Sequence, residues 1–158
     1  MANSLCEVLL TEAQLEGAAD TAAVTGQGGD VNAGAIVDFW GVVRALEDGN
    51  EIDGIEYEVH RAMAEHQLRL IAKEAASKFV LKQITIHHRI GFVPVGDASL
   101  FLQVRAQRRA AAFGASGWVV DELKRRVPIW KRPKFKIDNQ RERESRLSVQ
   151  PSSILSRE

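Results

Sequence analysis

The sequence predicts a single domain of the α+β class, with a mainly antiparallel or mixed sheet and about three helices. Two patterns lead to this prediction. Several short segments alternate apolar with polar residues, as half-buried strands do, and two longer segments repeat apolar residues at helical spacing. Turns or single helices join these segments. The chain has 158 residues, of which 45% are hydrophobic, and this is sufficient for one sizeable core.

The N-terminal third is predicted to contain two strands and one short helix. Residues 6–10 (CEVLL) form the first strand, and residues 11–14 (TEAQ) have the pattern of a capping box that begins the helix. Residues 18–34, rich in alanine and glycine, indicate a loop. Residues 35–43 predict a buried strand. We expect this strand to form a hairpin with the alternating segment 55–59, across a long polar turn.

The clearest helix lies in the middle of the chain. Alternation after it predicts strands at residues 84–88 and 99–105, and the segment GFVPVGD between them, at 91–97, is turn-like. The apolar residues that share one face of the helix are Ala64, Leu68, Ile71, Ala72, Ala75 and Phe79.

A further helix is predicted over about residues 110–126. It should end near Val127, because the residue before Pro128 disfavours helical geometry. We assign the α+β catalytic domain to residues 1–136 and expect the polar residues 137–158 to form a flexible C-terminal tail. The predicted buried face of this helix carries Phe113, Val120, Leu123 and Val127.

The bulk composition argues against several classes of function. The chain carries 21 Lys+Arg and 21 Asp+Glu, so it has no net charge to attract nucleic acid or a membrane. Its single cysteine, Cys6, excludes an intramolecular disulfide and a cysteine-rich metal site. No secretory signal or membrane-spanning segment is recognised. We therefore expect a cytoplasmic protein with no metal and no cofactor.

Positive charge is nevertheless concentrated between residues 105 and 136. Only Asp121 and Glu122 oppose it there. A solvated basic face is one interpretation, and a nucleic-acid surface is another, although the segment lacks the aromatic–basic interleaving of a stacking platform. The basic residues are Arg105, Arg108, Arg109, Lys124, Arg125, Arg126, Lys131, Arg132, Lys134 and Lys136.

Two features of this segment indicate a site for a small anionic substrate. Lys124 and Lys131 bracket the apolar residues 127–130, where Trp130 is expected to exclude water. A lysine in such a pocket can act as a nucleophile or general base. Each lysine also has a simpler interpretation, as a helix C-terminal cation or as a surface residue.

Arginine and histidine pairs add to these candidates. Arg108 and Arg109 lie at a strand-to-helix junction, where arginines can bind a phosphate together with the helix N-terminus. They can also be a solvated pair. Neighbouring strand residues face opposite sides, so His87 and His88 do not suit one metal ion, and we expect His88 to be structural.

The order of several short motifs resembles the molybdopterin synthase large-subunit family, of the MoaE type. The resemblance extends from about residue 34 to 135. The motifs that carry it are GA at 34–35, FWGVVR at 39–44, YE at 57–58, MA at 63–64, HRIG at 88–91, R at 109 with AF at 112–113, DELK at 121–124 and VPIWK at 127–131.

The resemblance implies a hammerhead α+β fold and a sulfurtransferase reaction. The family converts cyclic pyranopterin monophosphate into molybdopterin by installing two dithiolene sulfurs. Sulfur arrives as a thiocarboxylate on the C-terminal Gly-Gly of a small, ubiquitin-like partner, whose tail enters the large subunit. A homodimer of large subunits with one small subunit at each end forms a heterotetramer. This reaction needs no resident cofactor.

The family's site residues carry over position by position. Lys124 matches a catalytic lysine close to the thiocarboxylate, and Lys131 matches the second catalytic lysine, in the pterin pocket. Arg44 matches an arginine of that pocket. Arg109 matches an arginine that binds the anionic end of the substrate across the dimer, and Arg108 stands where the family has a histidine.

A second departure follows Lys131. The family's acidic residue two places after this lysine is absent, and Arg132 and Pro133 follow it instead. With Arg108, this departure motivates an alternative hypothesis, a divergent non-catalytic subunit that binds the small sulfur carrier or an anionic ligand.

Overall fold

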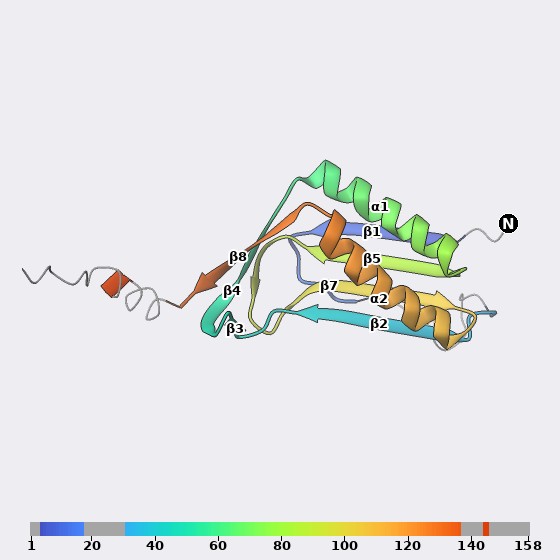
Figure 1. The fold of residues 1–158 in the computed structure, drawn as a ribbon, viewed down its shortest axis with the longest axis horizontal. Helices are drawn as coiled ribbons and strands as arrows, with labels where there is room; N and C mark the ends of the chain where they lie inside the picture. The colour runs from blue at the N-terminus through green and yellow to red at the C-terminus, as the bar shows by residue number, and fades with distance from the viewer. Residues whose placement is uncertain (1–3, 18–30, 137–143, 146–158) are drawn as a thin grey trace, which may run out of the picture.

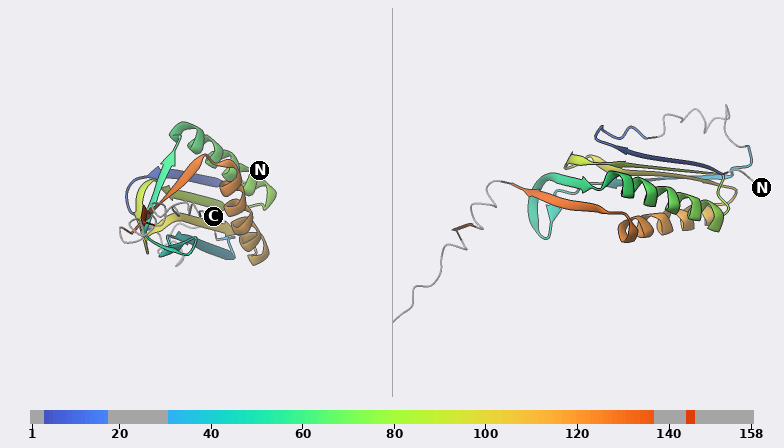
Figure 2. Two further views of the ribbon diagram at one scale, coloured as in Figure 1. Left: turned by 60° about the vertical axis from the view of Figure 1, so that its left-hand side comes forward. Right: turned by 90° about the horizontal axis from the view of Figure 1, so that it is seen from above.

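Two helices pack side by side on one face of a four-stranded mixed sheet (Figures 1 and 2). The computed structural model describes residues 4–17, 31–136 and 144–145. Within them the α+β class is confirmed. Two α-helices are present in these residues, α1 (Arg61–Lys78) and α2 (Arg109–Arg126), rather than about three. Neither is long and apolar enough to cross a membrane.

The four strands of the main sheet lie in the order β1-β5-β7-β2. β1 runs parallel to β5, whereas β5 pairs antiparallel with β7 and β7 with β2. β5 and β7 are therefore central, and β1 and β2 form the two edges. The strands are β1 (Leu5–Thr11), β2 (Ala35–Val42), β5 (Gln83–Arg89) and β7 (Ala98–Ala106).

A smaller antiparallel sheet extends from one end of the main sheet (Figure 1). Its order is β3-β4-β6, and β8 also pairs with β4. The tight turn of the β3–β4 hairpin has Asp48 and Gly49 at positive φ (49° and 77°), as a two-residue hairpin turn requires. The strands are β3 (Leu46–Glu47), β4 (Asn50–Val59), β6 (Gly91–Pro94) and β8 (Ile129–Phe135).

Each sheet has its own hydrophobic core. The larger core lies between the main sheet and the helices, where Leu68 and Ile71 of α1 face Ile84 and Ile86 of β5. The smaller core includes Val43, Ile52, Ile55, Tyr57 and Val93. Ile129, at the start of β8, packs against both cores and so joins them.

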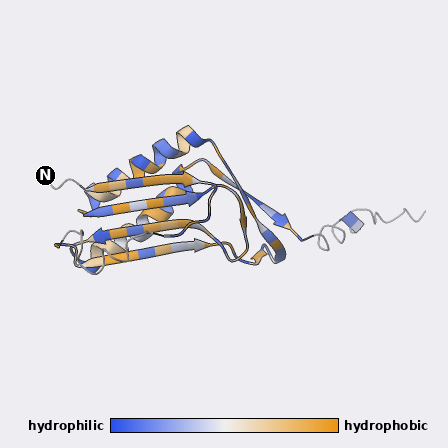
Figure 3. Ribbon diagram, turned by 180° about the vertical axis from the view of Figure 1, so that it is seen from behind, coloured by the Kyte–Doolittle hydropathy of each residue, from blue (hydrophilic) through white to orange (hydrophobic). Residues whose placement is uncertain are grey.

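Seen from the side opposite the helices, the strands of the main sheet contain both polar and apolar residues (Figure 3). Two polar pairs on this face link neighbouring strands. Nε2 of His87 lies 2.6 Å from Oε1 of Glu7, and Nε2 of Gln103 donates to Oδ1 of Asp38 at 2.9 Å. The largely buried side chains of His87 and Gln103 therefore have polar partners on adjacent strands.

The predicted helix after residue 11 is wrong within the described residues. Thr11 is the last residue of β1, and its Oγ1 accepts a hydrogen bond from the backbone N–H of Ala13 at 3.0 Å. This bond closes a short bend in place of the N-cap bond that starts a helix. Residues 12–17 are not helical. Most of the predicted loop at 18–34 lies outside the described residues.

The predicted hairpin between residues 35–43 and 55–59 is also wrong. β2 pairs with β7, and β4 belongs to the other sheet. β2 is an edge strand rather than a buried one, and its Phe39 and Trp40 are 37% and 40% exposed. The apolar composition of this strand gave no indication of its partner, which lies about 60 residues further along the chain.

Three strands were not predicted. The two-residue strand β3 lies where a turn was expected. Half of the turn-like segment 91–97 forms β6, which pairs with β4. Residues 129–135 form β8, whose basic composition hides its strand character. Pro133 is tolerated in β8 because this strand lies at the edge of its sheet.

The prediction for α2 is correct in extent but not fully in orientation. The helix ends at Arg126, before Val127 and Pro128, as expected. Leu123 and Val127 are buried, but Phe113 is 65% exposed. The small residues Ala112, Ala115 and Ser116 are buried instead, and they allow close approach to the sheet. Of the predicted tail, residues 137–158, all but 144–145 lie outside the described residues.

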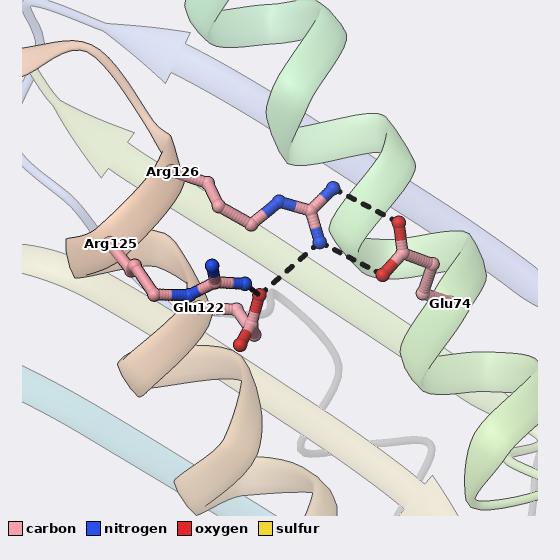
Figure 4. A network of polar contacts seen from close by, with 4 residues as sticks. All are labelled: Glu74, Glu122, Arg125 and Arg126. Carbon is pink, nitrogen blue, oxygen red and sulfur yellow. Dashed lines mark hydrogen bonds and ion pairs between the residues drawn. The ribbon is translucent and has the colours of Figure 1, made fainter.

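A network of ion pairs ties the C-terminal end of α2 to α1 (Figure 4). Arg126 donates to both carboxylate oxygens of Glu74, at 2.8 and 3.0 Å, and to Glu122 at 3.3 Å. Arg125 also donates to Glu122, at 2.6 Å. The hydrogen bond from Arg126 is the largest cause that holds the pKa of Glu74 below its ordinary value of 4.5. The bond from Arg125 likewise lowers the pKa of Glu122.

We expect Glu74→Gln to lower the melting temperature at pH 7 in low salt. A carboxylate whose pKa is lowered on folding stabilises the protein above its unfolded pKa, about 4.5, and this contribution is lost as pH falls through the lower folded value. The difference between variant and wild type should therefore shrink below about pH 4. It should also shrink in 1 M salt, because the pair is exposed and screened.

The matched control is Glu65→Gln on the same helix. Glu65 contacts only Arg61 and Arg69 of α1, each at 3.7 Å, among the ion pairs of the described residues. Glu65→Gln should lower the melting temperature less than Glu74→Gln does. Equal effects, or a Glu74→Gln effect that is independent of pH, would show that the link between the helices does not stabilise the fold.

Candidate functional site

A cavity of about 520 Å³ opens where the two sheets meet the C-terminal end of α2. Residues from β2, β3, β4, β5, β7, α2 and β8 line it. Its volume is in the range of pockets that bind small organic molecules. Apolar side chains, among them Phe39, Val42 and Leu100, form part of its wall.

The cavity brings together three of the five predicted site residues. Arg44, Lys124 and Lys131 all line it, although they are widely separated in sequence. Arg44 follows β2, where Val43 is fixed by a backbone bond from its N–H to the Asp97 carbonyl (3.0 Å).

The two lysines reach the cavity from different elements. Lys124 lies in the last turn of α2. Lys131 lies on β8, directly opposite Tyr57 of β4. Both lysine side chains are exposed at the cavity, so both are accessible to a ligand.

Trp130 does not exclude water from the cavity as expected. Side chains alternate along a strand, and Ile129 and Lys131 line the cavity while Trp130 does not. Trp130 is 56% exposed. β8 begins at Ile129, directly after Pro128, and its alternation places Trp130 on the other face from Ile129 and Lys131.

Arg108 and Arg109 lie at the opposite end of α2 from the lysines. Arg108 is the N-cap residue and makes no side-chain capping bond, and Arg109 begins the helix. Fifteen residues separate Arg109 from Lys124, which corresponds to roughly 22 Å along a helix. Neither arginine lines the cavity. One chain therefore does not bring all five predicted residues to one place.

Four polar residues of the cavity were not predicted as site residues. They are Glu47, Tyr57, His88 and Ser99. His88 was expected to be structural, and no single pattern marked the others. What these residues share is a position near the ends of strands that meet at the cavity. This shared position is apparent only once the pairing of the strands is known.

His88 is a buried, neutral histidine. It is 5% exposed, and its Nδ1 lies 2.7 Å from the carbonyl oxygen of Arg89. Its ring packs edge-on against Tyr57, with centroids 5.3 Å apart. The pKa of His88 falls from 6.5 to about 4, chiefly through burial; the Arg89 hydrogen bond opposes this fall and the charge of Lys131 adds to it.

Tyr57 belongs to a short hydrogen-bond chain. Its Oη donates to Oγ of Ser99 at 3.1 Å, and Ser99 Oγ donates to the Gly41 carbonyl at 3.4 Å. Burial is the main cause that raises the pKa of Tyr57 above 10; the Ser99 bond opposes it and the charge of Glu47 adds to it. Tyr57 is therefore a neutral phenol at physiological pH.

The cavity is suited to an anionic organic ligand. Three cationic side chains against one carboxylate, Glu47, leave an excess of positive charge around it. Among the described residues, no group of three or more His, Cys, Asp or Glu side chains is arranged to hold a metal ion.

Comparison with known proteins gives consistent results. The family described as MoaE protein matches residues 10–126. The molybdopterin synthase catalytic subunit of Oryza sativa subsp. indica is 41% identical over 103 residues, covering 65% of this chain and 53% of that protein. The protein of the same name from Homo sapiens is 39% identical over 99 residues, covering 63% and 53%. The chain thus spans about half the length of these two curated relatives.

A solved structure shares the fold. The crystal structure of molybdopterin synthase from Staphylococcus aureus superposes with a TM-score of 0.70 at 27% identity, covering 83% of this chain and 91% of that one. The family match includes β2, β5 and β7 of the main sheet and both helices, but only the last two residues of β1. By this match, which covers well over half of its length, the chain belongs to the MoaE protein family.

Proposed function

We propose that this chain is the catalytic subunit of a molybdopterin synthase. It transfers sulfur from the C-terminal thiocarboxylate of a small ubiquitin-like partner to cyclic pyranopterin monophosphate, and so makes the dithiolene of molybdopterin. Family membership and the names of the curated relatives support this function.

One observation carries the proposal. Arg44, Lys124 and Lys131, selected from sequence, line a single cavity of about 520 Å³. A substrate with a fused ring and a cyclic phosphate needs such a volume and such charges. The apolar wall suits the ring, and the cations suit the phosphate and the thiocarboxylate.

The two lysines have distinct roles in this proposal. The amine of Lys124, at the end of α2, acts on the partner's thiocarboxylate. Lys131 contacts the pterin, and its position on β8 opposite Tyr57, in the cavity that His88 also lines, supports this role. Arg44 holds an anionic group of the substrate at the end of β2.

Arg108 and Arg109 act in this proposal on the pocket of a second copy of the chain. They lie about 22 Å along α2 from Lys124, and the first turn of the helix holds no acidic residue that would balance them. A helix N-terminus with two arginines favours an anion such as the substrate's phosphate. A homodimer, with a small subunit bound at each end, would bring both ends of α2 to one substrate. We place this assembly in the cytoplasm.

The direct test is reconstitution of sulfur transfer. The full chain is mixed with cyclic pyranopterin monophosphate and a thiocarboxylated small subunit, and molybdopterin is measured. We expect molybdopterin to form. No product, under conditions in which an established synthase works, would disprove the proposed function.

Lys124→Ala should reduce turnover by about 10²–10⁴-fold, the usual contribution of a side chain that acts in proton transfer. Because Lys124 is exposed, the variant should lose less than about 0.5 kcal/mol of stability. The matched control is Lys73→Ala, an exposed lysine of α1 outside the cavity, which should retain activity. Turnover near that of wild type in Lys124→Ala would remove this residue from the mechanism.

Complementation tests whether Arg109 acts across the dimer. Lys124→Ala and Arg109→Ala should each be inactive alone. When chains of the two variants assort at random, half of the dimers contain one chain of each variant. Each such dimer has one intact site of its two. About a quarter of wild-type activity should therefore return. If both residues served the same chain's pocket, mixing would restore nothing.

The non-catalytic alternative rests on Arg108, because arginine cannot act as an acid or base at neutral pH as histidine can. The other departure is accommodated structurally, since Arg132 forms an ion pair with Glu58 at 3.0 Å. A non-catalytic subunit would bind the small partner but form no product. If the wild type is inactive and Arg108→His gains turnover, the alternative is correct.

A further inference from the structure

The hydroxyl groups in the cavity have fixed hydrogen-bond directions. A carbonyl oxygen can only accept, so the contact with Gly41 makes Ser99 the donor there. Ser99 then accepts from Tyr57, whose only proton is used in that bond. The Oη of Tyr57 can therefore only accept a hydrogen bond from a ligand.

The imidazole of His88 has the same polarity. Its Nδ1 must carry the proton, because its partner is the Arg89 carbonyl oxygen. In a neutral ring, Nε2 is then an acceptor. Among the described residues, the Nε2 atom of His88 has no hydrogen-bond partner. It is also not fully enclosed by protein, since Nε of Arg89 is the one fully enclosed side-chain atom without a partner in these residues. A ligand can therefore satisfy it.

The charged side chains of the cavity comprise one hydrogen-bond acceptor and three donors. Glu47, near enough to raise the pKa of Tyr57, is an acceptor. Arg44, Lys124 and Lys131 are donors and all carry positive charge. In the described part of the chain, the cavity therefore offers side-chain acceptors at Tyr57, His88 and Glu47, and cationic donors elsewhere.

We propose that Tyr57, His88 and Glu47 form an acceptor set that determines ligand specificity by binding N–H or O–H groups of a ring. The ligand class is a heterocycle that carries hydrogen-bond donors on one edge and an anionic group on another. The 2-amino-4-oxo ring of a pterin has such an edge. The inference rests on the proposed function for the choice of pterin as the probe.

An acceptor set rejects ligands that lack donors. A lone pair in a buried site loses its contact with water when a ligand enters, and the loss is uncompensated if the ligand offers another acceptor. Sites built to hydrogen-bond a substrate group discriminate strongly against analogues that lack it. An aromatic ring of the right size but with carbonyl groups in place of N–H donors should therefore bind poorly.

The first experiment compares pterin with 1,3-dimethyllumazine, a pteridine that has carbonyl groups and no N–H donor on the same ring. Binding to the full wild-type chain is measured by ligand fluorescence. We expect pterin to bind at least about tenfold more tightly, the effect of one well-formed hydrogen bond. Equal affinity, or tighter binding of 1,3-dimethyllumazine, would overturn the proposal.

The second experiment changes the acceptor at His88. His88→Asn keeps a donor near the Arg89 carbonyl but places no acceptor at the position of Nε2, whereas His88→Gln places its carbonyl oxygen close to that position. We expect His88→Asn to weaken pterin binding about tenfold and His88→Gln to recover most of the loss. A merely structural histidine would not show this difference.

The matched control is His87→Asn on the same strand. His87 contacts Glu7 and does not line the cavity, so this variant should bind pterin like wild type. Wild-type affinity in His88→Asn, or equal losses in the two His88 variants, would overturn the role of His88. Neither binding experiment uses the sulfur-carrier partner, so failure of turnover with a retained pterin preference would refute the proposed function alone.

Discussion

The antiparallel pairing of β8 with β4 is the constraint on which the cavity depends. Pro128 ends α2 and directs the chain into β8, where Ile129 pairs with Val59 and packs against both cores. The same register places Lys131 opposite Tyr57. Without this pairing the two lysines would be connected only by the six residues between them and would share no wall. The smaller sheet is therefore part of the site rather than an appendage to the main one.

Charge and hydrogen-bond polarity in the cavity follow from this arrangement. Burial is the main cause that lowers the pKa of His88 and so keeps its ring neutral. The positive charge of Lys131 at the cavity adds to this effect. A neutral His88 with its proton on Nδ1 is necessarily an acceptor on the other nitrogen. Lys131 and the acceptor His88 are thus not independent features, because the charge of the lysine favours the neutral imidazole.

Local patterns predicted α1, α2 and the two lysines of the cavity, and the order of the family's motifs added Arg44. Pairing between distant segments decided the rest. The apolar face of α1 and the stop at Pro128 depend on residues within a few positions, and both are confirmed. The partner of β2 and the strand character of the basic residues 129–135 depend on contacts far along the chain. His88 was expected to be structural, and its burial and its bond to the Arg89 carbonyl agree with that expectation. That it also lines the cavity is recognisable only when the opposite wall is known.

Helix α2 sets the geometry of any complete site in the proposed function. It carries Lys124 in its last turn and Arg109 in its first, and a rigid helix of this length keeps them roughly 22 Å apart. The ion pairs from Arg126 to Glu74 hold the lysine end of α2 against α1, so bending of the helix toward its own N-terminus is disfavoured. A substrate of pterin size cannot span that distance within one chain. If both ends of α2 act on one substrate, two copies of the chain must supply them, and dimerisation is then a geometric requirement of the chemistry.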